Sequence, residues 1–233
     1  MSFEDTFKRG FDTYKWNKTF WWGNGFIGDN AVSYFSPNNV WAANGLLSLE
    51  TNKSETKSDT GMPYTGGVVT TYKKFYQTYG YFETRLKVPK GGGLGPAFSL
   101  APEDTSWPPE IDVMEIPGVR GDNATKVWMT NHYIDANGKP SSRDSDGTWT
   151  ASSGFDTDYH TYGLLWQPGL LVWYVDDVER YRTTVSVPDK PCYIALVSGV
   201  TNDDGRWAGS PANTTFPQYM SVNWVRVWKR AGS

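Results

Sequence analysis

The chain has 233 residues, enough for one large hydrophobic core, and no change in composition divides it, so we expect residues 1–233 to form a single domain. Its net charge of −3 gives no basic surface for nucleic acid, and no apolar run reaches the length that crosses a membrane. The aromatic fraction of 16%, with 12 Trp and 14 Tyr, exceeds what a core requires and is typical of surfaces that stack on flat, hydroxylated rings.

Short strands and turns are expected in the first quarter of the chain. Residues 3–11 alternate apolar and polar side chains, and residues 20–25 (FWWGNG) place aromatic side chains beside turn residues, which suits the edge of a cleft. Residues 40–49 predict two strands joined by an Asn-Gly turn, and the polar residues 51–63 predict a surface loop.

The next segment predicts a half-buried antiparallel strand at residues 80–88, because apolar and polar side chains alternate without interruption. The glycines of residues 90–96 lack the spacing and the following helix of a phosphate-binding loop, so we expect only a turn there. Residues 97–100 predict a strand that leads through the loop 102–107 into an acidic segment.

The acidic segment, residues 108–118, contains three carboxylates within six residues. In a strand, Glu110 and Asp112 share one face. One extra residue, a β-bulge near Met114, returns Glu115 to that face and leaves the aliphatic residues between the acids on the other. The sequence therefore predicts a row of three acids along one surface.

This row of acids has two interpretations. Acids on an exposed edge strand can prevent sheets from joining, but three like charges without a Lys or Arg among them repel each other. Glycoside hydrolysis uses paired carboxylates, one ionised to attack the sugar and one protonated to donate to the leaving oxygen, about 5–5.5 Å apart in retaining enzymes. A bent, bulged strand permits this geometry for Glu110 and Glu115, with Asp112 sharing a proton or hydrogen bond with Glu110.

The rest of the chain predicts further short strands and no helix. The expected strands are residues 126–133, 160–166, 170–176, 178–183, 191–200 and 220–229, with a turn at Asp176 and Asp177. The single cysteine, Cys192, excludes an internal disulfide and is expected to be buried in a strand. At least ten short strands with frequent Gly or Pro turns predict an all-β sandwich of two curved antiparallel sheets with a concave face.

Residues 110–115 (EIDVME) resemble the signature of glycoside hydrolase family 16, in the form with an extra residue typical of its laminarinase-like branches. Other segments similar to that family's landmarks are residues 79–89 (YGYFETRLKVP), 106–109 (SWPP), 159–163 (YHTYG), 166–168 (WQP), 173–176 (WYVD) and 216–220 (FPQYM). The resemblance runs from Phe3 to Trp228. It implies a β-jelly-roll sandwich in which Glu110 is the nucleophile, Asp112 assists it and Glu115 is the acid/base.

The resemblance is closest to bacterial endoglucanases and exopolysaccharide-trimming endoglycanases. It implies a retaining endo-β-glycanase that hydrolyses internal β-1,3 and/or β-1,4 bonds of a β-glucan or a glucan-like bacterial exopolysaccharide. A galactan endohydrolase of the agarose or carrageenan type is the main alternative. A non-catalytic carbohydrate-binding sandwich would not need all three acids, and transglycosylases of the family usually have the shorter motif.

Several residues are candidates for substrate binding. Trp107 matches a family position that stacks on a sugar, and Trp207 lies in a segment that resembles a sugar-platform loop. His132 is expected to bond the substrate or the acid/base, or to be structural, and His160 is expected to be structural. The remaining candidates for the wall of the cleft are Phe26, Asn30, Tyr34 and Arg85.

The sequence also departs from the family. Gly95 and Ser99 stand where many members have Trp, Asn30 lacks the Glu that often accompanies it, and Val197 and Ser198 stand where an Asn is common. These departures predict a wider cleft that tolerates substituted polymers.

No cofactor or bound metal is expected, since Asn223 stands where an Asp is often linked to a calcium site, and a structural calcium has only weak support. The only partner expected is the polysaccharide substrate, with neither nucleic acid nor membrane. We expect a monomer that is secreted, with its signal peptide absent from this chain.

Overall fold

The computed structural model describes residues 1–24, 32–54, 61–118, 124–201 and 207–229. The elements in this part of the chain are β1 (Phe3–Asp5), β2 (Ser33–Phe35), the 3-10 helix η1 (Pro37–Asn39), β3 (Val40–Ala43), β4 (Leu46–Lys53), β5 (Tyr64–Thr70), β6 (Gly80–Lys87), β7 (Ala97–Pro102), β8 (Glu110–Glu115), β9 (Lys126–Ile134), β10 (Pro140–Ser141), β11 (Asp146–Thr150), β12 (His160–Gln167), β13 (Leu170–Val175), β14 (Val178–Thr183), β15 (Cys192–Ser198), the 3-10 helix η2 (Pro211–Asn213) and β16 (Gln218–Trp228). The predicted all-β class is confirmed.

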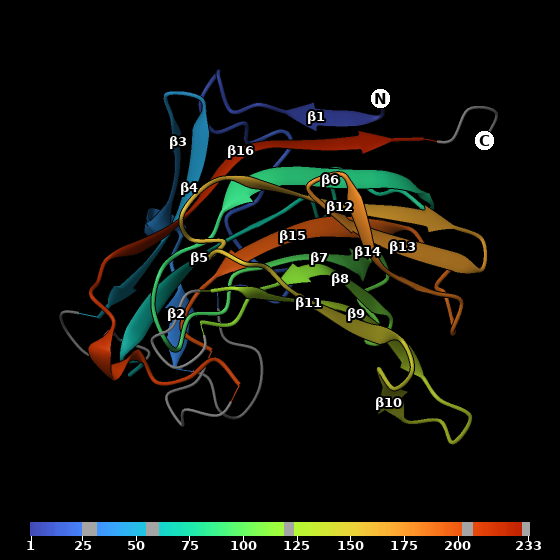
Figure 1. Cartoon of the computed structure of the whole chain (residues 1–233). Coiled ribbons are helices and arrows are strands. Elements are labelled where there is room, and N and C mark those ends of the chain that lie inside the picture. The colour runs from blue at the N-terminus through green and yellow to red at the C-terminus, as the bar shows by residue number, and fades with distance from the viewer. Residues whose placement is uncertain (25–31, 55–60, 119–123, 202–206, 230–233) are drawn as a thin grey trace.

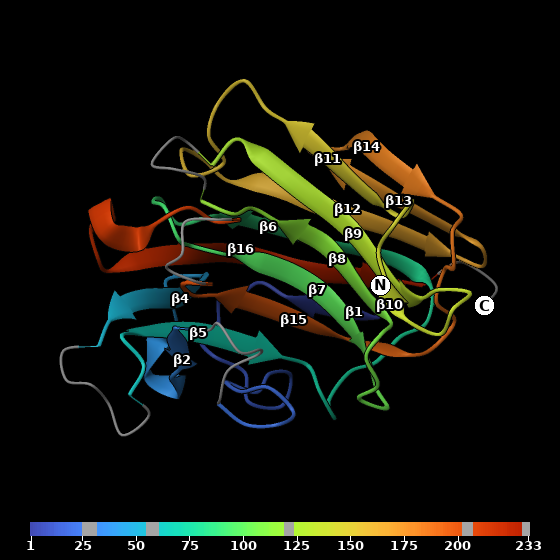
Figure 2. The same cartoon turned by 90° about the horizontal axis from the view of Figure 1, so that it is seen from below.

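The strands form two layers (Figures 1 and 2). The layer that we call the cleft sheet has the order β10-β9-β8-β7-β15-β5, with β11 also paired to β9. The outer sheet has the order β4-β16-β6-β12-β13-β14, with β1 on β16 and β3 on β4. The sheets are continuous through two residue pairs between β4 and β5, Asn52 with Thr65 and Lys53 with Tyr64. Of the strand pairs in the described residues, β2 with β5 is parallel and the others are antiparallel.

The core lies between the two layers and contains large side chains from both. Trp166, Trp173 and Phe82 of the outer sheet and Phe98 of the cleft sheet are all 0% exposed. The burial of residues along β6 alternates strictly, so one face of the outer sheet is apolar and is covered by the other layer. Burial of each such side chain contributes roughly 1.5–3 kcal/mol, which holds the sheets together.

The predicted turn at Asp176 and Asp177 is confirmed, whereas two other predicted segments differ from the structure in where their strands end. Asp176 and Asp177 both have positive φ, at 51° and 63°, which matches the two-residue turn that joins β13 to β14. The loop predicted at residues 51–63 is partly wrong, because β4 extends to Lys53 where it pairs with β5. The alternating residues 3–11 form a strand only at Phe3–Asp5.

The cysteine prediction is confirmed. Cys192 lies in β15 and is 1% exposed, with its thiol directed to the carbonyl of Lys190 at 3.4 Å. Burial raises the pKa of this thiol to about 12. Among the described residues, no helix is long and apolar enough to span a membrane.

Candidate active site

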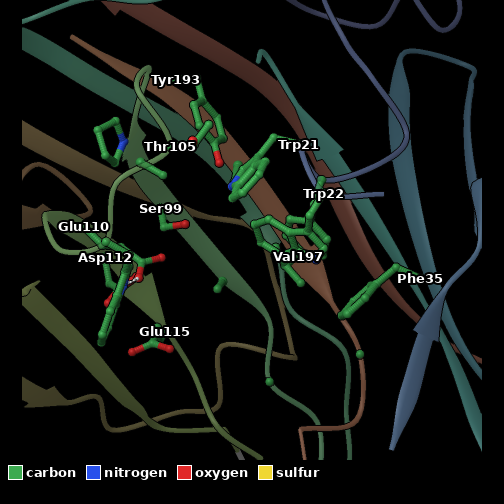
Figure 3. Close-up of a pocket in the computed structure, with 18 of the residues that line it drawn as sticks. Trp21, Trp22, Phe35, Ser99, Thr105, Glu110, Asp112, Glu115, Tyr193 and Val197 are labelled. Atoms are coloured by element: carbon green, nitrogen blue, oxygen red, sulfur yellow. Dashed lines mark hydrogen bonds between the residues drawn. The ribbon is translucent and has the colours of Figure 1, made fainter. Parts of the chain in front are cut away.

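The cleft sheet carries a cleft of about 570 Å³ (Figure 3). Strands β7, β8 and β15 contribute to it, together with loop residues near 21, 106 and 200. Its lining residues are Phe20, Trp21, Trp22, Phe35, Gly95, Ala97, Ser99, Ala101, Pro102, Thr105, Ser106, Trp107, Glu110, Asp112, Glu115, Tyr193, Ala195, Val197, Gly199, Val200 and Thr201. All three predicted acids line it.

The bulge predicted near Met114 is confirmed on both sides of β8. Toward β7, Asp112 pairs with Ser99 and Met114 with Phe98, so the register shifts by one residue. Toward β9, Asp112 pairs with Thr130 and Glu115 with Trp128, so three steps along β8 match two steps along β9. Because of this extra residue, Glu115 returns to the face of Glu110 and Asp112, and Figure 3 shows the three carboxyl groups on one side of the strand.

Glu110 is held by a residue from the loop that precedes its strand. The indole Nε1 of Trp107 donates a hydrogen bond to Glu110 Oε2 at 2.8 Å, and the Trp107 side chain remains exposed at the cleft edge. The hydrogen bond therefore fixes the orientation of this carboxyl group at the edge of the cleft. The predicted site residue Trp107 therefore contacts the proposed nucleophile directly.

The loop that carries Trp107 is itself fastened to the segment before β15. Lys190 Nζ lies 2.7 Å from Asp104 Oδ2, while the backbone and hydroxyl of Ser106 donate to Asp104 Oδ1. The pKa of Asp104 is lowered to about 2, mainly by the hydrogen bond from Lys190 and to a smaller extent by those from Ser106. Asp104 is therefore ionised at neutral pH and connects the two segments.

Asp112 is the most enclosed of the three acids, at 4% exposed. Its Oδ2 lies 2.9 Å from Nε2 of His132, which stands opposite Glu110 on β9. Burial, and to a smaller extent the charge of Glu110, raises the pKa of Asp112 well above its usual range. His132 thus bonds the middle acid, a partner that was not among those expected for it from the sequence, while its predicted contact with the substrate stays a prediction.

Glu115 has the environment of a proton donor. Burial raises the pKa of its carboxyl well above the usual range, the charges of Asp112 and Glu110 raise it further, and His132 opposes the rise. A carboxyl that keeps its proton toward neutral pH can protonate a leaving oxygen.

The opposite side of the cleft is aromatic. Phe20 and Trp22 stack with centroids 4.4 Å apart and an interplanar angle of 6°, while Trp21 meets Trp22 edge-on at 5.3 Å. Trp21 and Trp22 remain 45% and 40% exposed. We call Phe20, Trp21, Trp22 and Phe35 the aromatic wall; Figure 3 shows Trp21, Trp22 and Phe35 across the cleft from the acids.

The prediction that residues 20–25 lie at a cleft edge is confirmed for Phe20, Trp21 and Trp22. Sequence reasoning did not single these out as binding residues. It also missed Tyr193, which lines the cleft from β15. For Phe20, Trp21 and Trp22, the available sequence signal was the run of aromatic residues beside glycine at residues 20–25.

Other predicted wall residues lie elsewhere. Arg85 belongs to β6 of the outer sheet, where its guanidinium lies 5.0 Å from the ring centre of Tyr159, so the structure does not bring it to the cleft. Tyr34 of β2 is not among the lining residues, whereas its neighbour Phe35 is. Asn30 and Phe26 lie outside the described residues.

Trp207 lies near the cleft without lining it. Its ring is 3.7 Å from the position that a Cβ on Gly95 would take, and the same Cβ would be 2.1 Å from Cγ2 of Thr201. Thr201 therefore occupies the space beside Gly95, and the wider cleft expected at this position stays a prediction. Ser99 and Val197 do line the cleft, whereas Ser198 is buried and bonds to Thr51.

His160 contacts structural partners: its Nδ1 lies 2.7 Å from Asp176 Oδ2, and its ring meets Phe155 edge-on. No group of three or more His, Cys, Asp or Glu residues in the described ranges is arranged to hold a metal ion.

The chain is similar to known proteins along most of its length. The chain is 35% identical to "Endo-1,3-1,4-beta-glycanase ExsH" of Rhizobium meliloti, over 91% of this chain and 47% of that protein. It is 30% identical to "Glucan endo-1,3-beta-glucosidase A1" of Niallia circulans, over 94% of this chain and 36% of that protein. The chain thus spans about half or less of the length of these curated relatives.

Among solved structures, the catalytic domain of an endo-1,3-beta-glucanase (laminarinase) from Thermotoga petrophila superposes with a TM-score of 0.83 at 26% identity, covering 98% of this chain and 97% of that one. The family model of glycosyl hydrolases family 16 matches residues 27–226. The jelly-roll expectation is confirmed by this match. The chain belongs to glycoside hydrolase family 16.

Proposed function

We propose that this domain is a retaining endo-β-glycanase that hydrolyses internal β-1,3 and/or β-1,4 bonds of a β-glucan or a glucan-like bacterial exopolysaccharide. The observation that carries the proposal is the row of Glu110, Asp112 and Glu115 along one face of a bulged strand, inside a cleft with an aromatic wall. The relatives named as an endo-1,3-1,4-beta-glycanase and a glucan endo-1,3-beta-glucosidase support the substrate class.

The three acids have different roles because their surroundings differ. Glu110, with the Trp107 indole donating to it, attacks the anomeric carbon as the ionised nucleophile. Glu115, whose pKa is raised by burial, donates its proton to the leaving oxygen and afterwards takes a proton from the attacking water. Asp112, whose pKa is also raised by burial, holds a proton that it shares with Glu110 and so limits the repulsion between neighbouring carboxylates.

Further properties follow from the same cleft. All three acids come from one strand of one chain, so we propose that a monomer is active. Because a polysaccharide of this kind does not cross membranes, we also propose that the enzyme acts outside the cell after secretion.

A galactan endohydrolase is the second candidate. It is favoured by one observation, the 29% identity to "Keratan-sulfate endo-1,4-beta-galactosidase" of Sphingobacterium multivorum over 94% of this chain. The difference between the candidates lies in the sugar, since both use the same acids.

A panel of substrates tests the proposal. The chain is incubated with laminarin, mixed-linkage β-glucan, agarose and a bacterial exopolysaccharide, and the size of the products is followed with time. We expect oligosaccharides of intermediate size from the glucans, and the β anomer as the first product by NMR. An α anomer would exclude retention, and cleavage of agarose alone would favour the galactan candidate.

A further inference from the structure

The strand β8, which carries the three acids and is called the catalytic strand below, receives a hydrogen bond from the outer sheet. Trp173 of β13 is 0% exposed, and its indole Nε1 donates to the main-chain carbonyl of Asp112 at 2.9 Å. Asp112 is the residue at which the register of β8 shifts toward both neighbouring strands. A bulge interrupts the ladder of strand hydrogen bonds, so the indole supplies a donor at the point where the strand partners change.

The indole ring is fixed in turn by the edge of the sandwich. Tyr181 of β14 packs on Trp173 with centroids 5.3 Å apart and an interplanar angle of 36°. Gly147 of β11 makes room for this contact, because a Cβ at that position would lie 2.3 Å from Tyr181 Cγ. The position of the indole therefore depends on packing between β11, β14 and β13, remote from the cleft.

We propose that Trp173 is a positioning residue for catalysis: its indole N–H fixes the main chain of Asp112 at the bulge, and thereby the place of the Asp112 side chain between Glu110 and His132. This inference rests on the proposed function, in which Asp112 assists Glu110. His132 holds the side chain and Trp173 holds the backbone, so that Asp112 is fixed at two points.

The chain offers a matched control. Trp166 of β12 is also 0% exposed, and its Nε1 also donates to a main-chain carbonyl at 2.9 Å, that of Pro188. Pro188 lies outside the catalytic strand. Trp166→Phe therefore loses the same kind of buried hydrogen bond as Trp173→Phe without touching Asp112.

The two variants are compared on a soluble β-glucan, well below their melting temperatures. Both should lose a few degrees of Tm, since each loses a buried hydrogen bond. For Trp173→Phe we expect kcat to fall about 10-fold with little change in KM, because a small displacement of a catalytic group is costly. For Trp166→Phe we expect kcat to stay within about 2-fold of the wild type. Equal kcat values for the two variants, or a change confined to KM, would overturn the inference.

A second variant separates the donor from the packing. Replacement of Trp173 by 3-benzothienylalanine keeps the double ring and substitutes sulfur for the N–H group. If this variant keeps the wild-type kcat, the hydrogen bond has no positioning role; a loss similar to that of Trp173→Phe supports it.

A readout independent of activity distinguishes failure of this inference from failure of the proposed function. The carboxyl carbon of Asp112 is titrated by NMR, with Glu110, Glu115 and His132 followed in the same spectra because they face it. We expect the pKa of Asp112 to move down in Trp173→Phe, as a looser strand admits water, and to stay unchanged in Trp166→Phe. An inactive wild type would refute the proposed function alone, whereas identical titrations in both variants would refute the positioning role.

Discussion

The two sides of the cleft are built in different ways. The acids lie on β8, a strand paired on both sides, and each of Glu110 and Asp112 is held by a named donor or partner. The aromatic wall comes from a loop and the short strand β2, and its rings are held by contacts with one another. Bond making and breaking require fixed distances between the reacting groups, whereas stacking of a ring on a sugar tolerates small displacements of the ring. We therefore expect changes on the acidic side to lower kcat and changes on the aromatic wall to raise KM.

The largest effect is expected for Glu110→Ala. Without a nucleophile the covalent intermediate cannot form, so kcat should fall by at least about 10³-fold. A small added anion such as azide should restore part of the turnover by taking the place of the missing carboxylate. Circular dichroism should show an unchanged fold. A variant that keeps more than a few per cent of the wild-type rate would show that the nucleophile has been assigned wrongly.

Asp112→Asn should lower kcat about 10²-fold, since it keeps the shape and removes the proton that is shared with Glu110. The acidic limb of the pH profile should change its position, because Asn cannot take up or release the proton through which Asp112 is coupled to its neighbours. The measurement is kcat between pH 4 and 8, for this variant and for the exposed control Asp144→Asn. An unchanged profile with a near-normal rate would show that Asp112 has no part in catalysis.

Trp107→Phe tests the donor at the boundary between the two sides. It removes the indole N–H that bonds Glu110 but keeps an aromatic ring. Since this bond is charge-assisted but lies at an exposed site, we expect about a 10-fold loss in kcat. A change in KM alone would show that Trp107 contributes to substrate binding, as the aromatic wall does, and not to catalysis.

Trp21→Ala should raise KM about 5-fold to 10-fold with little change in kcat, because stacking of an exposed ring on a sugar contributes binding in the ground state and the transition state alike. Trp41→Ala is the control, since Trp41 is similarly exposed, at 37%, on β3 away from the cleft. Equal KM values for the two variants would remove the aromatic wall from substrate binding.

The smallest effect concerns stability. The pKa of Glu115 is raised in the folded state, so the folded protein binds this proton more tightly than the unfolded chain, and stability falls as pH rises through the window above the ordinary Glu value. Glu115→Gln removes this cost and should raise Tm at pH 7 by about 2–4 °C, while losing activity. At pH 4 the difference from the wild type should shrink. A variant less stable than the wild type at pH 7 would contradict the raised pKa.

The features that could be predicted from the sequence have local causes. The alternation of β6 and the three acids of β8 follow from a period of two residues, and the bulge follows from the break in that period. The positive φ values of Asp176 and Asp177 similarly reflect a turn made of adjacent residues.

The features that were missed depend on contacts between distant segments. Alternation in β6 placed Arg85 on a polar face, but it could not show that this face belongs to the outer sheet. The space at Gly95 is filled by Thr201, more than a hundred positions later. The strand β11 was not predicted either, because its residues are mostly polar and it forms by pairing with β9.

The buried thiol of Cys192 has a practical consequence. Thiols react with maleimides and iodoacetamides as thiolates, and this one is enclosed in β15 with its pKa raised to about 12. A cysteine introduced at an exposed turn position such as Lys139 would therefore be the only thiol of the chain that reacts readily at neutral pH. A dye or a solid support can then be attached at one chosen point on the folded protein while the native cysteine stays in place.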